Sequence, residues 1–242
     1  MGVKIFDIED ILKFSKEYLD NKLSNLNLLE LGEQELKIFN NELDNNITKK
    51  FLEKNPRKYS NKMKNRIGIY CKDFLSSIFN KVSSIDTHTT CKKTLKLNLI
   101  DEIDLGKKFD VITNFGTTEH VGEYDNILKN TQYQAFKNIH NLLNSKGLVF
   151  NVVPAKYENN QIHGAFNYSL QFFEKLAELC NYKILYNEIK KRGDIYHVYC
   201  YFLKLDESTF ISEKEFNQLI NLLLLTERIK PNPKKYLESI QY

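Results

Sequence analysis

Two stretches of the chain decide its fold class: FDVITNFGTTEHV, residues 109–121, and LLNSKGLVFNVVP, residues 142–154. Each contains a nearly continuous apolar run that stops at a glycine or a proline, which is typical of a strand buried on both faces. The sequence between them, residues 124–143, predicts a long helix. A strand, a helix and a second buried strand in this order are typical of a parallel sheet with helices packed on its faces.

The same alternation extends in both directions from these stretches. The other predicted strands are residues 26–32, 82–86, 94–98, 183–189 and 195–205, and the other predicted helices are residues 6–26, 169–180 and 212–229. The last two strands are separated by Arg192-Gly193-Asp194, a tight-turn sequence, and therefore read as an antiparallel hairpin. We predict an α/β fold whose mostly parallel sheet is covered on both faces, in a single domain over residues 1–242.

Two parts of the chain lie outside the regular alternation. From Gly32 to Asp86 there are 54 positions (86 − 32 = 54), more than one crossover helix needs. We therefore predict that residues 33–80 form a helical, basic insertion between the first and second strands. Residues 206–242 are predicted to be a C-terminal helical extension.

Positive charge is concentrated in the predicted insertion. Residues 49–66 carry eight lysines and arginines and one acid, a net +7, whereas the whole chain is +4, so the rest sums to −3. Two interpretations remain open: a solvated helix face, or a surface that attracts a phosphorylated acceptor at the mouth of a site. Nucleic acid is the less favoured partner, because the pI of about 8.6 is modest for that role.

Composition excludes several classes of protein. An apolar fraction of 42% is enough for a sizeable core and excludes a disordered chain. The apolar cluster at residues 222–225 is far too short to span a bilayer, and acids interrupt the first residues where a secretory signal would be apolar, so we expect a soluble, cytoplasmic protein. The four cysteines contain no CxxC pair, which argues against a zinc cluster or a disulfide framework.

In open parallel sheets, ligands bind beyond the carboxyl ends of the strands. The segments at those ends are LLELGEQ (28–34), SSID (83–86), KLNL (96–99) and the GTTEH turn at residues 116–120. In this order, and together with residues 142–154, they resemble the motifs of the class I S-adenosylmethionine-dependent methyltransferases. The resemblance spans roughly residues 26–205, and its most distinctive match is FGTTEHV.

The resemblance implies a Rossmann-like, seven-stranded, mostly parallel sheet with an antiparallel last strand, and S-adenosylmethionine as cofactor. It implies that Asp86 holds the ribose hydroxyls and that Asn98 meets the adenine. The other cofactor-binding residues that it implies are Glu30, Gly32, Asn114, Phe115 and Gly116.

The candidate catalytic residues are two histidines. His120, just past the fourth strand, is a candidate general base, because imidazole titrates near neutral pH and can take a proton from a hydroxyl. His163, in the loop after the fifth strand, is the second candidate. For each, a histidine that only packs or bonds a neighbour is the alternative. Glu119 is a candidate to orient the imidazole, and Thr117 or Thr118 to cap the following helix.

We predict no metal site, since His88, His140 and His197 lack a spaced set of partner ligands. The predicted function is methyl transfer to a small polar acceptor, most readily an oxygen of a sugar or of a phosphorylated or nucleotide-linked metabolite, as in surface polysaccharide biosynthesis. Two alternatives stay open. One is a non-catalytic binding subunit with the same fold, favoured by the glycine-poor first motif. The other is a nucleic-acid methyltransferase that uses the basic insertion.

Overall fold

The computed structural model describes residues 2–19, 22–39, 45–54, 66–89, 93–122, 128–157 and 163–223. Its centre is a seven-stranded sheet in the order β6-β5-β2-β7-β8-β10-β9. The strands are β2 (Asn27–Leu31), β5 (Lys81–Asp86), β6 (Leu95–Lys96), β7 (Phe109–Phe115), β8 (Leu143–Pro154), β9 (Tyr182–Arg192) and β10 (Ile195–Lys204). Strand β10 is antiparallel to both of its neighbours, and every other pair is parallel. The predicted sheet and its antiparallel last strand are confirmed.

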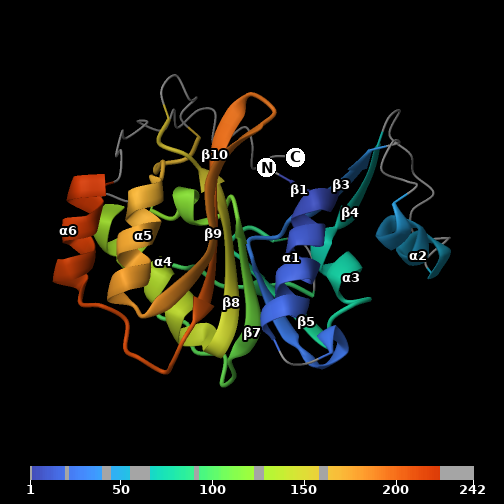
Figure 1. The fold of residues 1–242 in the computed structure, drawn as a ribbon, viewed down its shortest axis with the longest axis horizontal. Helices are drawn as coiled ribbons and strands as arrows, with labels where there is room; N and C mark the ends of the chain where they lie inside the picture. The colour runs from blue at the N-terminus through green and yellow to red at the C-terminus, as the bar shows by residue number, and fades with distance from the viewer. Residues whose placement is uncertain are drawn as a thin grey trace.

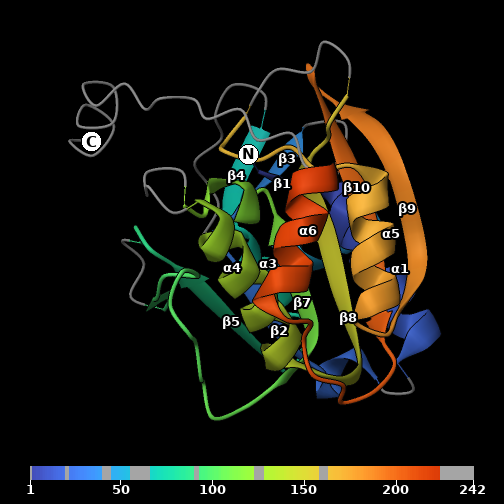
Figure 2. The ribbon, with the colours of Figure 1, turned by 90° about the vertical axis from the view of Figure 1, so that its left-hand side faces the viewer.

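Helices cover both faces of this sheet (Figures 1 and 2). Helices α4 (Leu128–Leu142), α5 (Leu170–Leu179) and α6 (Glu213–Leu223) pack on one face, and α1 (Ile5–Tyr18) and α3 (Cys71–Leu75) on the other. Alternation along each strand sends side chains to two separate cores: Leu29 and Leu31 of β2 join the α4–α6 core, whereas Leu28 joins the α1–α3 core. Both cores are rich in aromatic rings.

The predicted insertion is not entirely helical. Residues 33–80 contain α2 (Asn46–Lys54) and α3, but also β3 (Glu35–Phe39) and β4 (Arg66–Tyr70), which form a second sheet with β1 (Val3–Lys4). In β3 only Leu36 and Ile38 are buried, a period of two that suits a strand with one covered face. Within the basic stretch, Lys49 and Lys50 are exposed, and residues 55–65 lie outside the described part of the chain.

The described part of the C-terminal extension belongs to the main core. Phe216, Leu219 and Ile220 of α6 are buried among the aromatic residues of α4 and α5. The rest of the predicted extension, residues 224–242, lies outside the described residues. Among the described residues, no helix is both long and apolar enough to cross a membrane.

Candidate active site

A cleft with a volume of about 580 Å³ opens where β2, β5 and β7 end. This is the edge of a parallel sheet at which ligands bind, beyond the carboxyl ends of the strands. Five residues predicted from sequence line it: Gly32, Asp86, Asn98, Gly116 and His120. They come from four different segments, so the structure brings these predicted residues together.

The backbone turns at the floor of the cleft pack tightly against each other. Gly32 has φ +70°, a conformation that favours glycine, and a Cβ there would lie 2.5 Å from Oγ1 of Thr117. That Thr117 hydroxyl donates a hydrogen bond to the carbonyl oxygen of Leu31, 2.7 Å away. The turns after β2 and β7 are therefore fixed to one another, and a side chain at position 32 would separate them.

Asp86 is held at the end of β5 by two backbone donors. The N–H of Glu33 donates to Oδ2 and the N–H of His88 to Oδ1, each at 2.7 Å. Each carboxylate oxygen has a second lone pair and can accept one more hydrogen bond. Asp86 thus presents a fixed negative charge to the cleft, of the kind that binds two neighbouring hydroxyl groups.

Three residues that the resemblance marks as cofactor-binding do not line the cleft. Phe115 is buried in the α1–α3 core, and Glu30, only 1% exposed, lies on that same side of the sheet, near Cys71 and Ser84. Glu30 alternates with leucines that face the other core, so its side chain points behind the cleft floor. Burial raises the pKa of Glu30 to about 8, although the neighbouring Ser84, Cys71 and Lys72 lower it.

The third of these residues, Asn114, bonds to protein groups instead. Its Nδ2 donates to Oγ1 of Thr118 and to Oδ1 of Asn151, both at 3.0 Å, and its Oδ1 accepts from the N–H of Thr118 at 3.2 Å. Thr117 makes no side-chain cap on the turn that follows β7, and Asn114 accepts the bond there instead. The start of the predicted helix, for which Thr117 or Thr118 was the candidate cap, lies outside the described residues. Asn114 fixes the short helix η3 (Thr118–His120) to the end of β7.

The two candidate bases lie side by side. The rings of His120 and His163 meet edge to face, with centroids 4.9 Å apart. Glu119 lies beside them with a fully buried side chain, and its Oε1 is 3.8 Å from Nε2 of His120, whose side chain is 40% exposed. One ligand atom from each of the three residues falls within 4.8 Å of the others. Two imidazoles and a carboxylate thus converge at one end of the cleft.

Other cleft residues were not predicted as site residues from the sequence. Gln34, His88 and Leu99 line the cavity beside the motif residues. Each lies within two positions of a predicted site residue, and this closeness in the chain is the only feature of the sequence that indicates a place in the cleft. The grouping of Glu119 with both histidines had no signal of this kind, because His163 belongs to a separate loop.

No protein-family model matches the chain, and no curated protein sequence does. Its main sheet is seven-stranded and mostly parallel, with an antiparallel last strand, β10. This is the fold that the resemblance to the class I methyltransferases implies.

Solved structures with a similar fold include three methyltransferases. A 1,6-didemethyltoxoflavin-N1-methyltransferase of Burkholderia thailandensis, with bound 1,6-didemethyltoxoflavin and S-adenosylhomocysteine, is 10% identical over 83% of this chain and 90% of its own, with a TM-score of 0.47. The N-methyltransferase NodS of Bradyrhizobium japonicum is 12% identical over 83% and 97%, with a TM-score of 0.44. Phosphoethanolamine N-methyltransferase 1 of Haemonchus contortus, with phosphoethanolamine and S-adenosylhomocysteine, is 9% identical over 96% and 48%, with a TM-score of 0.47. At these identities the likeness is one of fold.

Proposed function

We propose that this chain is an S-adenosylmethionine-dependent methyltransferase that methylates an oxygen of a small polar acceptor. The observation that carries the proposal is the cleft itself. It lies at the carboxyl ends of β2, β5 and β7, and the motif residues Gly32, Asp86, Asn98 and Gly116 line it. When bound, S-adenosylmethionine supplies a methyl group on a positively charged sulfur, and transfer of that group to the acceptor leaves S-adenosylhomocysteine.

The residues of the cleft fit this cofactor. Gly32 lines the cleft with backbone atoms alone, which a ligand can approach closely. Asp86 would accept hydrogen bonds from the two ribose hydroxyls, since both of its oxygens are already oriented by backbone N–H groups and keep a free lone pair. Asn98, with its amide next to the apolar Leu99, would meet the adenine.

The acceptor would enter at the other end of the cleft, beside His120 and His163. A volume of about 580 Å³ lies within the range of roughly 300–1,000 Å³ typical of small-molecule sites, which favours a sugar or another metabolite over a macromolecule. The acceptor hydroxyl would lie beside these side chains, and holding it in line with the methyl group would supply much of the acceleration.

The basic stretch supports a phosphorylated or nucleotide-linked acceptor. Residues 35–70 follow Gln34, a residue of the cleft wall, and their helix α2 carries exposed lysines at positions 49 and 50. A net charge of +7 over residues 49–66 would attract a phosphate.

Calorimetric titration with S-adenosylhomocysteine tests the proposal. We expect 1:1 binding, weakened in Asp86→Ala by roughly 1.5–3 kcal/mol, the scale of hydrogen bonds to a charged group. Asp104→Ala is the matched control. Asp104 is exposed and also accepts a bond from the backbone N–H two positions on, at Gly106, but it is not on the cleft. Failure of the wild-type protein to bind at millimolar ligand would refute the enzyme proposal.

A further inference from the structure

We propose that Glu119, His120 and His163 form a binding site for a divalent transition-metal cation at the acceptor end of the cleft. The donor set is two imidazole nitrogens and one carboxylate, which is the ligand chemistry of zinc and of iron, cobalt or manganese. Magnesium and calcium prefer oxygen ligands alone, so two imidazoles argue against them. The sequence predicted no metal site, because the third ligand lies in a distant loop.

The ligand atoms are close enough for one cation to bridge them. The three donor atoms lie within 4.8 Å of one another, and the carboxylate of Glu119 is 3.8 Å from Nε2 of His120. Zinc bonds of about 2.0–2.1 Å separate neighbouring ligands by about 3.4 Å in a tetrahedron. The spacing of Glu119 and His120 is already close to this value, at 3.8 Å. The edge-to-face packing of the rings leaves their nitrogens near the carboxylate.

The backbone holds the two ligand-bearing segments together. The N–H of Ala165 donates to the carbonyl oxygen of Glu119, at 2.7 Å. Gly164, which lies between His163 and Ala165 in the chain, has φ +80°. A Cβ on it would lie 2.8 Å from both Cγ and the carbonyl oxygen of Glu119. The loop that carries His163 can approach Glu119 this closely only because position 164 has no side chain.

A buried network fixes the turn that carries Glu119 and His120. Gln132 of α4 donates from Nε2 to the carbonyl oxygen of Thr118, at 2.7 Å, and its Oε1 accepts from the hydroxyl of Tyr168, also at 2.7 Å. The same hydroxyl lies 3.2 Å from Oγ1 of Thr118. The two segments are therefore positioned before any ligand arrives, and such preorganisation of supporting groups tunes the affinity of metal sites.

The arrangement of the site indicates a role in substrate binding. Three protein ligands leave at least one coordination position open, which distinguishes catalytic from structural metal sites. His120 lines the cleft and its side chain is 40% exposed, so a cation held there would be accessible from the cleft. An acceptor hydroxyl bound there would lose its proton to water more readily. This role rests on the proposed function, whereas cation binding does not.

The test is a calorimetric titration of the full chain with Zn²⁺, repeated with Co²⁺ and followed by the visible absorption of the bound cobalt. Both use a Cys91→Ser background, which removes one competing thiol. We expect one site per chain. His120→Asn, His163→Asn and Glu119→Gln should each weaken it by at least about tenfold, the lower end of the effect of losing even a supporting group. His88→Asn is the matched control, since this histidine lines the same cleft but lies outside the cluster.

Equal Zn²⁺ affinity in the wild type and the His120→Asn, His163→Asn double variant would overturn the site, as would equal weakening by His88→Asn. Far-UV circular dichroism establishes that each variant is folded. If Glu119→Gln does not fold, the variants of the exposed His120 and the half-buried His163 still test the site. Titration with S-adenosylhomocysteine separates the two proposals. Cofactor binding without cation binding refutes the metal site alone, and cation binding without cofactor binding refutes the methyltransferase alone.

Discussion

The backbone N–H of Cys71 donates a hydrogen bond to the carbonyl oxygen of Gln34, 2.8 Å away. Gln34 belongs to the cleft wall and Cys71 begins α3, the helix that leads to β5. The bond joins the two ends of residues 35–70, which contain α2 and the second-sheet strands β3 and β4. This segment is shorter than the predicted insertion of residues 33–80.

The positive charge of the basic stretch, residues 49–66, has a testable role. Reversing three of its lysines in the variant Lys58→Glu, Lys62→Glu, Lys64→Glu should raise KM for a phosphorylated acceptor and leave S-adenosylhomocysteine affinity unchanged. The reason is that the positive charge of the lysines would attract the phosphate of the acceptor and not the cofactor. Steady-state kinetics at low and high salt measure it, and the wild-type advantage should shrink as salt rises, because exposed charges are screened over about 8–10 Å.

A second triple variant, Lys183→Glu, Lys191→Glu, Lys214→Glu, makes the same change in net charge at exposed positions on β9 and α6. It should leave KM close to the wild-type value. If both triple variants behave alike, the stretch acts only through net charge and its proposed role in acceptor binding is wrong.

Asn114 should support activity without touching the ligands. Asn114→Ala removes three hydrogen bonds to Thr118 and Asn151, both buried, and should lower the free energy of unfolding by about 1–3 kcal/mol. Turnover should fall as the turn bearing His120 loosens. Urea denaturation and steady-state kinetics measure the two effects. Asn144→Ala, which removes a half-buried bond to Asp110 away from the cleft, should affect stability alone. Full turnover in Asn114→Ala would contradict this positioning role.

Glu30 should make the fold less stable as pH rises. Its pKa is raised by burial from an ordinary 4.5 to about 8, so the folded protein keeps a proton that the unfolded chain loses above pH 4.5. Stability is therefore complete below about pH 4.5 and declines up to about pH 8. Glu30→Gln should remove this slope and exceed the wild type at pH 8 by roughly 3–5 kcal/mol. Urea denaturation from pH 5 to 9 measures the difference, and parallel curves for the two proteins would contradict the prediction.

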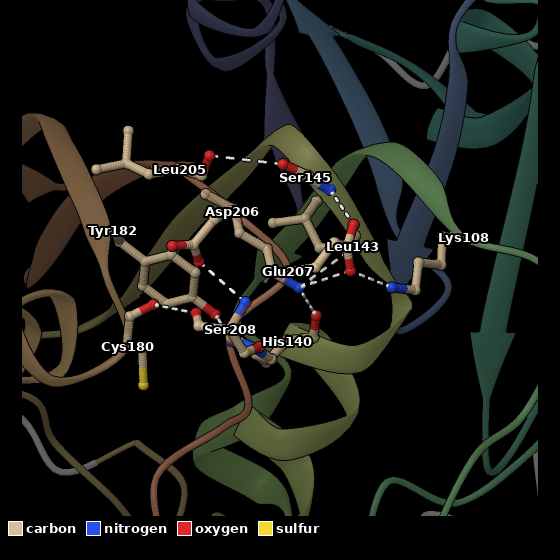
Figure 3. A network of polar contacts seen from close by, with 11 residues as sticks. Lys108, His140, Leu143, Ser145, Cys180, Tyr182, Leu205, Asp206, Glu207 and Ser208 are labelled. Atoms are coloured by element: carbon tan, nitrogen blue, oxygen red, sulfur yellow. Dashed lines mark hydrogen bonds and ion pairs between the residues drawn. The ribbon is translucent and has the colours of Figure 1, made fainter.

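His140 should have the opposite pH dependence. Figure 3 shows its ring among the polar groups at the end of α4, with Nδ1 2.6 Å from the Tyr182 hydroxyl and Nε2 2.6 Å from the carbonyl oxygen of Ser208. Desolvation lowers its pKa from 6.5 to about 4, although the Ser208 bond raises it. The stabilisation is present above pH 6.5 and is lost as pH falls towards 4.

The lost stabilisation should be on the order of 2 kcal/mol, and His140→Gln should lack that part of the acid dependence. Thermal unfolding at pH 4 to 7 measures it. The rest of this region should stay folded, because the buried Lys204 ammonium group donates to the carbonyl oxygens of His140 and Leu143, at 2.9 and 3.3 Å. An acid dependence that is the same in both proteins would assign the effect to other groups.

Local sequence patterns determined most of the elements. The apolar runs at residues 109–115 and 148–153 predicted buried strands, because a strand covered on both faces places nearly all of its side chains in an apolar environment. The tight turn at residues 192–194 predicted the hairpin of β9 and β10, and Ser169 marked the start of α5, where its Oγ accepts from the N–H of Phe172 at 3.1 Å. Each of these signals acts over a few positions.

The pairing of β3 with β1 needed the tertiary structure, because Val3 and Leu36 are partners from opposite ends of a long segment. The direction of side chains at the cleft needed it as well. Glu30 is part of the LLELGEQ motif in the sequence, but the alternation of side chains along β2 points it away from the cavity. The cluster of Glu119, His120 and His163 exists only because Ala165 bonds to Glu119 across two loops. The sequence by itself determined the strands of the main sheet and the helices α1, α4, α5 and α6, since their patterns depend on neighbours in the chain. Which side chains converge was decided by contacts between residues that are distant in the chain and adjacent only in the folded protein.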